Sequence, residues 1–264
     1  MATPLRDMAV RRSGQAAPAR SLYRQYAPSS AEAASVALST WVGIAGWARG
    51  LRLFPDGCVD LVWNGSELLA VGPTEAAFVG RLRAGTVNVG VRLRPESAGA
   101  VLGFPAWRLR RGRLRLRDVW SSQGADAEAR LARTAPGDEQ RRMLQAIVAE
   151  RASGVQAPEP VVRAAVRQLE AGARHIGDLA GHLSIGERDL RRLFGDEVGL
   201  SPKALHRVFR FQRLLQRLPD LAAGRVGAAA MAVDLDYADQ AHMTRECRRI
   251  AGVSPVALAK RQAA

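Results

Sequence analysis

The stretch RDLRRLFGDEVGLSPKAL, residues 188–205, recurs in related form 53 positions later as AHMTRECRRIAGVSPVAL, residues 241–258. An internal repeat at a fixed offset indicates that one structural unit is used twice. The identical positions are Arg192 and Arg245, Gly199 and Gly252, and the set Ser201, Pro202, Ala204 and Leu205 with Ser254, Pro255, Ala257 and Leu258. The repeat therefore decides the fold of the C-terminal part of the chain.

Each copy lies inside a helical pattern that is interrupted by a tight turn. In the first, apolar spacing predicts a short helix over about 177–183, a turn at 184–186 and a longer helix near 187–198. The second copy repeats this order as a helix over about 225–234, a turn through Asp236 and Tyr237, a cap at Asp239 and a helix near 240–250. This order predicts two helix-turn-helix units.

A long helix is predicted to join the two units. Ser201 is a suitable N-cap and Pro202 fits the first turn, so this helix runs to about Arg217, with Pro219 ending it. At 1.5 Å per residue this helix spans about 24 Å. It can therefore hold the longer helices of the two units at a separation near ~34 Å, which is the helical repeat of DNA. Its arginines are expected to contact solvent or phosphate: Arg207, Arg210, Arg213 and Arg217.

The outer faces of the two longer helices carry the side chains that we expect to read bases. Arg188, Arg191 and Arg192 have the i, i+3, i+4 spacing that places them on one face, and arginine pairs bidentately with guanine. The second helix offers a mixed set for adenine, other base and phosphate contacts, namely Gln240, His242, Thr244 and Arg245. Three arginines on an exposed helix are also compatible with a solvated face, but the repetition of the helix-turn-helix unit favours binding to double-stranded DNA.

Composition agrees with an anionic partner. The 264 residues carry 39 Lys and Arg against 25 Asp and Glu, for a formal net charge of +14. The two cysteines, Cys58 and Cys247, cannot form a disulfide framework or a four-cysteine zinc site, and we expect neither cofactor nor metal. Residues 1–15 lack the apolar core of a signal peptide, so a cytoplasmic protein without a membrane span is expected.

The N-terminal part mixes strand and helix patterns. Residues 51–63 read as strand, turn and strand, and residues 67–71 and 87–93 as further strands. Residues 108–117 are read as a basic hairpin edge or, alternatively, as a phosphate-contacting strand. Asp56 and Gly57 are expected to form the turn, with Cys58 and Asp60 structural, although a pocket role for these polar residues is the alternative.

Proline and glycine in SGVQAPEP suggest the boundary between the two parts. The predicted organisation is an N-terminal sensor or dimerisation domain over 1–153, a linker over 154–160 and a DNA-binding domain over 161–264. The predicted fold class is α+β overall. It combines an N-terminal mixed α/β domain, with a small sheet or barrel, and an all-α C-terminal domain with two helix-turn-helix units.

The C-terminal part resembles the AraC/XylS family of bacterial transcription regulators over about residues 160–262. The motifs are IGDLAGHL (176–183), RDLRRLF (188–194), VGLSP (198–202), YADQAHMTR (237–245) and AGVSP (251–255). The resemblance implies that the seven side chains above contact bases or backbone, and that the protein binds promoter DNA and RNA polymerase, usually as an activator. It also implies a small-molecule effector or homodimer formation through the N-terminal part.

Three positions depart from the family pattern: Gly186 replaces a serine cap, Asp236 a turn glycine, and Cys247 a core phenylalanine. The loss of the serine cap at Gly186 costs little, whereas Asp236 and Cys247 both lie in the second unit, so we expect the first unit to be the dominant reader. The N-terminal motifs FPDGCVDLVW, VGPT and VGVRLRP resemble a sensor-type domain of unassigned ligand found in a subset of this family.

Three other functions were weighed. A methyl-accepting repair regulator requires four zinc-binding cysteines, and the chain has two. Residues 1–155 contain no histidine, which excludes Ser/His and Cys/His dyads there, so we expect no enzyme; a carboxylate-based enzymatic or small-molecule-binding domain fused to a DNA-binding module is the alternative. A sequence-blind basic packaging protein would bind every duplex with equal affinity.

Overall fold

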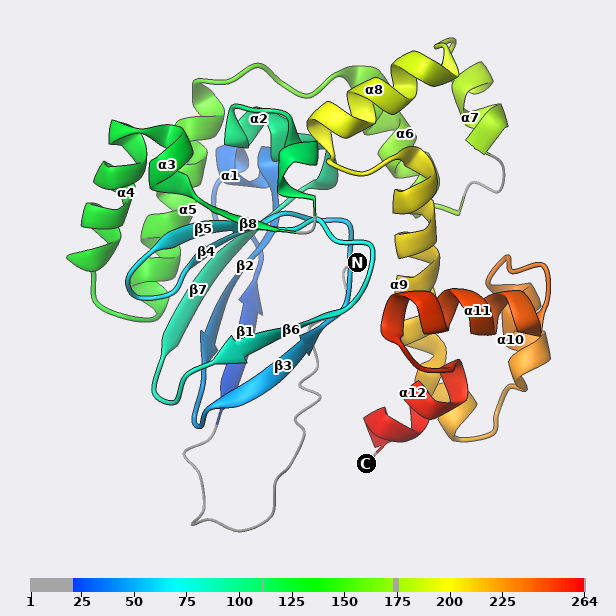
Figure 1. Ribbon diagram of the computed structural model, residues 1–264. Helices are drawn as coiled ribbons and strands as arrows, with labels where there is room; N and C mark the ends of the chain where they lie inside the picture. The colour runs from blue at the N-terminus through cyan, green and yellow to red at the C-terminus, as the bar shows by residue number, and fades with distance from the viewer. Residues whose placement is uncertain (1–20, 111, 173–175, 264) are drawn as a thin grey trace.

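A computed structural model describes residues 21–110, 112–172 and 176–263 (Figure 1). The stretch 1–15, read above for targeting signals, lies outside the described residues. A β-rich domain that also contains five α-helices extends to Ser153, and a wholly helical region follows from Pro160. The predicted α+β class, with two helix-turn-helix units in an all-α C-terminal part, is confirmed.

The N-terminal domain is built on an open six-stranded antiparallel sheet, not a barrel. Its strand order is β1-β2-β7-β4-β5-β8. The strands are β1 (Leu22–Tyr26), β2 (Ala37–Ile44), β4 (Asp60–Trp63), β5 (Leu68–Val71), β7 (Val87–Leu93) and β8 (Arg113–Arg115). The strands predicted over 67–71 and 87–93 are therefore confirmed.

A separate two-stranded ribbon projects from this sheet. It pairs β3 (Arg49–Leu53) with β6 (Phe78–Leu82) in antiparallel register. The residues between β3 and β4 form the predicted turn, in which Gly57 has a φ of 84°, a value that glycine adopts without strain. The two strands flanking this turn do not pair with each other, because the turn directs them into different sheets.

The basic segment 108–117 forms an edge, as predicted, but not a hairpin. The 3₁₀ turn η2 (Ala106–Leu109) leads into β8, which pairs with β5 at the end of the sheet. The three residues of β8, two of which are arginines, complete the hydrogen-bonded ladder with β5. Exposed charge at the edge of a sheet protects it from pairing with other chains. The helix α3 (Leu116–Trp120) follows directly.

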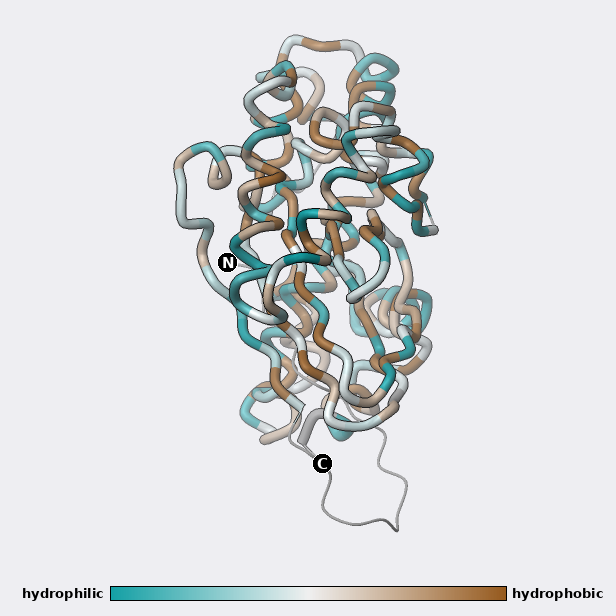
Figure 2. Tube along the Cα trace, turned by 90° about the vertical axis from the view of Figure 1, so that its left-hand side faces the viewer, coloured by the Kyte–Doolittle hydropathy of each residue, from teal (hydrophilic) through white to brown (hydrophobic). Residues whose placement is uncertain are grey.

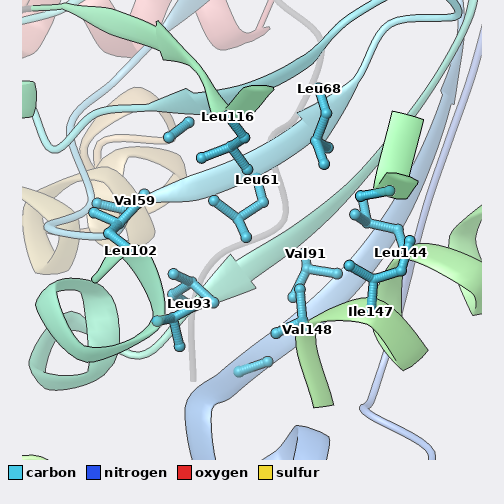
Figure 3. Close-up of a cluster of buried hydrophobic side chains, with 14 of the residues drawn as sticks. Val59, Leu61, Leu68, Val91, Leu93, Leu102, Leu116, Leu144, Ile147 and Val148 are labelled. Atoms are coloured by element: carbon cyan, nitrogen blue, oxygen red, sulfur yellow. The ribbon is translucent and has the colours of Figure 1, made fainter. Parts of the chain in front are cut away.

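The N-terminal core lies between the sheet and helices that cover one of its faces (Figure 3). Leu61, Val91 and Leu93 are fully buried on the sheet, and Leu144 and Val148 meet them from α5 (Asp138–Ser153). The remaining helices of this domain are α1 (Ala31–Val36), η1 (Pro95–Ser97), α2 (Ala98–Leu102) and α4 (Ser122–Ala132).

The C-terminal region contains seven described helices. They are α6 (Pro160–Glu170), α7 (Ile176–His182), α8 (Glu187–Glu197), α9 (Pro202–Ala222), α10 (Ala228–Asp234), α11 (Gln240–Ala251) and α12 (Pro255–Ala263). Hydrophobic and hydrophilic residues alternate along the trace as expected for packed amphipathic elements (Figure 2). None of the described helices has the length and apolarity needed to cross a bilayer.

Two helix bounds differ from the sequence prediction. Pro219 does not end α9, which continues to Ala222; the exposed proline lies in the last turn, where it removes a single backbone donor, while Leu218 stays buried. In the second unit α10 begins at Ala228 instead of 225, after Gly227 in an extended conformation.

Candidate nucleic-acid interface

The first helix-turn-helix unit comprises α7, a tight turn and α8. Ser184 closes the turn with a φ of 52°, and the N–H of Ile185 donates to the carbonyl of Ala180 at 3.1 Å. The apolar stripe of α8 enters the core through Leu190 and Phe194, which are 2% and 0% exposed. The opposite face of α8 is therefore directed outward.

The three predicted arginines of the first unit lie on this outward face. Arg188, Arg191 and Arg192 are all exposed. Among the described residues Arg192 forms only long ion pairs, 3.9 Å to the well-exposed Asp189 and 3.8 Å to the half-exposed Asp196. Because exposed pairs of this kind contribute little, the guanidinium is available to a nucleic acid at small cost.

The second unit repeats the geometry with a different turn residue. Asp236 takes the left-handed conformation, with a φ of 61°, and the N–H of Tyr237 donates to the carbonyl of Ala232 at 2.9 Å. Asp239 caps α11 by accepting the N–H of His242 at 2.6 Å. Gly186 offers α8 no side-chain cap, so the second reading helix has the better-capped start.

The predicted residues of the second unit do not form one uniform exposed face. Gln240 and Arg245 are exposed, whereas Thr244 is half-buried. The Nδ1 atom of His242 accepts the N–H of Ala238 at 3.3 Å, and its ring packs edge-on against Tyr237 at 5.5 Å. This histidine therefore stabilises the turn as well as lying on the reading helix.

Sequence reasoning missed two cations on the second helix, Arg248 and Arg249, which are both exposed. Arg248 is exposed and lies three residues after Arg245, which places both on the same side of α11. The corresponding position in α8 is Gly195, which packs near Trp107 of the N-terminal domain. The i, i+3 spacing of Arg245 and Arg248 is the sequence signal that could have identified Arg248.

The arginines of α9 divide into different environments. Arg210 does not reach solvent or phosphate as predicted: it is 7% exposed, and its Nη2 atom lies 2.6 Å from Oε2 of Glu246. Its Nη1 atom donates to the carbonyl of Asp236 at 3.0 Å, and its guanidinium stacks 4.3 Å from the centroid of Tyr237. Arg210 thus holds the turn and reading helix of the second unit on α9.

Arg207 also forms an ion pair with another residue of the same chain. Its Nη2 atom lies 2.8 Å from Oε2 of Glu75, which belongs to the loop before β6. Arg217 pairs with Asp220 and Asp234 at 3.0 and 3.6 Å. Both side chains are therefore engaged in ion pairs within the protein.

The polar residues of the PDGCVD segment form a buried ion cluster within the N-terminal domain. Arg92, 3% exposed, lies 3.1 Å from Asp56 and 2.9 Å from Asp60, and Asp60 also accepts the indole N–H of Trp41 at 3.3 Å. Asp56 caps its own turn by accepting the N–H of Cys58 at 3.0 Å. This is the structural role expected for the segment.

Family comparison agrees with the geometry of both regions. Residues 179–261 match a family described as "Helix-turn-helix domain", and residues 24–115 match "Domain of unknown function (DUF6597)". The predicted resemblance to AraC/XylS regulators is confirmed: the C-terminal region is an AraC-type helix-turn-helix domain. The chain is a DNA-binding transcription regulator with an N-terminal domain whose family has no assigned function.

Solved structures of ToxT from Vibrio cholerae are similar at low identity. An apo lysine-to-alanine variant is 10% identical, with a TM-score of 0.42, over 84% of this chain and 96% of that one. Wild-type ToxT bound to an unsaturated fatty acid is 10% identical, with a TM-score of 0.39, over 93% and 97%. ToxT bound to (E)-4-(8-methylnaphthalen-1-yl)but-3-enoic acid is 9% identical, with a TM-score of 0.40, over 92% and 98%. No curated protein matches the sequence.

Proposed function

We propose that the protein is a sequence-specific regulator that reads two successive major-groove segments of promoter DNA with α8 and α11. The observation that carries this proposal is the exposed arginine face of α8, Arg188, Arg191 and Arg192, opposite a fully packed stripe. Gln240, His242, Thr244 and Arg245 are the proposed contacts of α11. Contact with RNA polymerase, homodimer formation and a cytoplasmic location remain predictions from the sequence.

The two readers contribute unequally in this proposal. The first presents three cations that suit guanine edges, whereas His242 and Thr244 of the second are partly engaged within their own unit. Arg192→Ala should therefore lower the ratio of specific to nonspecific affinity more than Arg245→Ala does. Each lost bidentate base contact corresponds to about 1–3 kcal/mol of discrimination.

The test begins with in vitro selection of bound duplexes and footprinting of the selected site. Affinities of both variants are then measured on the selected site and on a scrambled duplex at several salt concentrations. Arg24→Ala, an exposed arginine of β1, is the control for the loss of one positive charge. A phosphate contact would weaken both duplexes equally and flatten the salt dependence, while unchanged affinity and preference in both variants would refute the assignment.

We also propose that the N-terminal domain responds to a small organic acid. A cleft of about 880 Å³ lies between the N-terminal domain and the helices α6 and α9. Four arginines line it, Arg94, Arg163, Arg167 and Arg213, together with the carboxylates Asp56, Glu96 and Glu170. The arginines outnumber the carboxylates, and the buried Nη2 atom of Arg213 has no hydrogen-bond partner among the described residues. A carboxylate would supply the missing acceptor.

Calorimetric titration with a panel of small carboxylates and their neutral amides tests this second role. Acids should bind more tightly than the matching amides, and Arg213→Met should remove that difference while leaving DNA binding without the acid intact. Equal binding of acid and amide, or no binding by any member of the panel, would count against an acid effector. The DNA-reading proposal does not depend on this result.

A further inference from the structure

The N-terminal domain contacts both reading helices at equivalent places in the repeat. In the first unit these contacts involve Glu197 and Gly199, and in the second they involve Ile250 and Gly252, which lie 53 positions later. All four residues lie at the C-terminal ends of α8 and α11 or just beyond them. Figure 1 shows both helices directed with these ends toward the N-terminal domain.

At the first unit, the contact is a close approach of backbone to backbone. A β-carbon at Gly99 of α2 would overlap the carbonyl oxygen of Asp196 and lie 3.0 Å from the Cα of Glu197. One at Gly199 would lie 2.9 Å from the carbonyl oxygen of Ala106. Such distances leave no space for any side chain, so α2 and η2 fix the end of α8 closely.

At the second unit, the ribbon supplies hydrogen bonds to the final carbonyl groups of α11. The N–H of Ala77 donates to the carbonyl of Ile250 at 2.7 Å, and the guanidinium of Arg52 donates to the carbonyl of Ala251. Helix ends leave such carbonyls without intrahelical partners. The N-terminal domain therefore completes the hydrogen bonding of the second reading helix.

A third contact lies between these two, on the helix that joins the units. The side-chain amide of Gln212 donates to the carbonyl of Pro55 at 2.6 Å, and Arg207 pairs with Glu75. A β-carbon at Gly57 would overlap the side chain of Leu205. Three points of support along α8, α9 and α11 restrict rotation of one unit relative to the other.

The contacts leave the reading faces uncovered. Arg188, Arg191, Arg192, Gln240 and Arg245 remain exposed, while the covered residues lie at the C-terminal ends of their helices. An inhibitory lid would cover the reading faces. The arrangement is instead that of a brace.

We infer that the N-terminal domain is a brace that fixes the separation and relative rotation of the two readers, and so determines which half-site spacing is bound. Gly99 and Arg52 are the positioning residues of this brace. The inference rests on the proposed two-helix reading of DNA for its consequence, but its mechanical part concerns the protein alone.

Two variants each weaken one contact of the brace, either that of Gly99 with α8 or that of Arg52 with α11. Gly99→Ala places a methyl group against the backbone of Asp196, and alanine favours the helix α2 more than glycine does, so the N-terminal domain keeps its fold. Arg52→Met removes the donor to α11 and retains an apolar stem. Gly43→Ala is the control, because the nearest atom to a β-carbon there, in Trp41, is 3.7 Å away.

The first measurement needs no DNA. Spin labels at Glu187→Cys and Ala241→Cys, both exposed, report the distance distribution between α8 and α11, while the native Cys58 and Cys247 are buried. The unmodified background and Gly43→Ala should give one narrow distribution, and Gly99→Ala and Arg52→Met broader ones. Identical distributions in all four proteins would overturn the inference.

The second measurement compares affinities for duplexes whose half-sites are separated by the selected spacing or by one base pair more or less. The ratio of preferred to altered spacing should fall by about fivefold or more in each brace variant, the lower end of coupling between linked sites, with base preference unchanged. Tighter binding by the variants would overturn the brace in favour of an inhibitory contact. If the wild type protects only one half-site, the two-reader function fails, and the spin-label result still decides whether the brace exists.

Discussion

Arg210 of α9 and Glu246 of α11 form a buried ion pair, with Nη2 and Oε2 2.6 Å apart and both side chains 9% exposed. The pair lies behind the second reading helix, and no such buried ion pair is found among the described residues of the first unit, whose core cluster is apolar. The second reader is therefore attached to the connecting helix by charge as well as by apolar packing.

Removing one partner should destabilise the second unit strongly. Arg210→Met leaves the Glu246 carboxylate buried without its cation, and Glu246→Leu leaves the guanidinium unpaired. Each should lower the free energy of unfolding by about 3 kcal/mol or more, measured by urea denaturation. The double variant should recover much of this loss, because an uncompensated buried charge is the main cost. Losses below about 1 kcal/mol in both single variants would show that the pair is well solvated.

The two reading helices should respond in opposite directions to substitutions at their caps. Asp239→Ala removes the acceptor for the N–H of His242 and should cost about 1 kcal/mol, whereas Gly186→Ser introduces an acceptor and should stabilise α8 by a few tenths. Gly186 already has an extended conformation that suits serine. Urea denaturation of both variants checks the signs, and a stabilising Asp239→Ala would contradict the observed cap.

The contribution of Glu197 to the stability of the protein should decrease between about pH 4.5 and 7. Burial, with further repulsion from Glu159 and Glu96, raises the pKa of this carboxyl to about 7 from an ordinary 4.5, although the N–H of Glu159 and Arg163 oppose the shift. A raised carboxyl pKa means that the folded state holds the proton more tightly. The stabilisation that protonated Glu197 provides is complete below the pKa of this carboxyl in the unfolded state. It is lost as the pH rises through the pKa in the folded state.

Glu197→Gln isolates this effect, because glutamine can still accept the N–H of Glu159. The difference in unfolding free energy between variant and wild type should grow in favour of the variant from pH 4.5 to 7 and then level off. Titrations of the other groups largely cancel in this difference. A constant difference across the range would mean that Glu197 ionises normally.

The thiol of Cys247 should be inert in the folded protein. It is 0% exposed, and burial raises its pKa to about 12. A thiol reagent at pH 8 should therefore modify Cys247 only after denaturant is added, since the thiolate is the reactive form. Cys58→Ala removes the second thiol from the assay, and rapid modification without denaturant would disprove the tight packing of this site.

The helical region was predictable because its signals are local. Ser201, Asp239, Gly199 and Gly252 define caps and helix ends within a few residues, and the observed bounds of α8 and α11 follow them. Pro219 was misread because its effect depends on position: in a last turn it removes little, and Leu218 keeps the helix packed.

Non-local pairing was not predictable in the same way. Nothing in the residues of β3 specifies β6 as its partner, because register is determined by distant packing. The burial of Arg210 likewise depends on Glu246, 36 residues later, and on Tyr237 above its guanidinium. The contacts of Gly99 and Ala77 with the reading helices have no sequence signal, since backbone atoms make them.

The helix α9 belongs to both C-terminal cores at once. Ala204, Leu205 and Val208 complete the core of the first unit, and Phe211, Leu214 and Leu218 complete that of the second. We therefore expect unfolding of the two halves to be coupled, because loss of either core removes packing from the helix that the other requires. A core substitution in one copy should therefore affect the stability of both. The two readers can differ in their surfaces, but their cores have to remain compatible with the same helix.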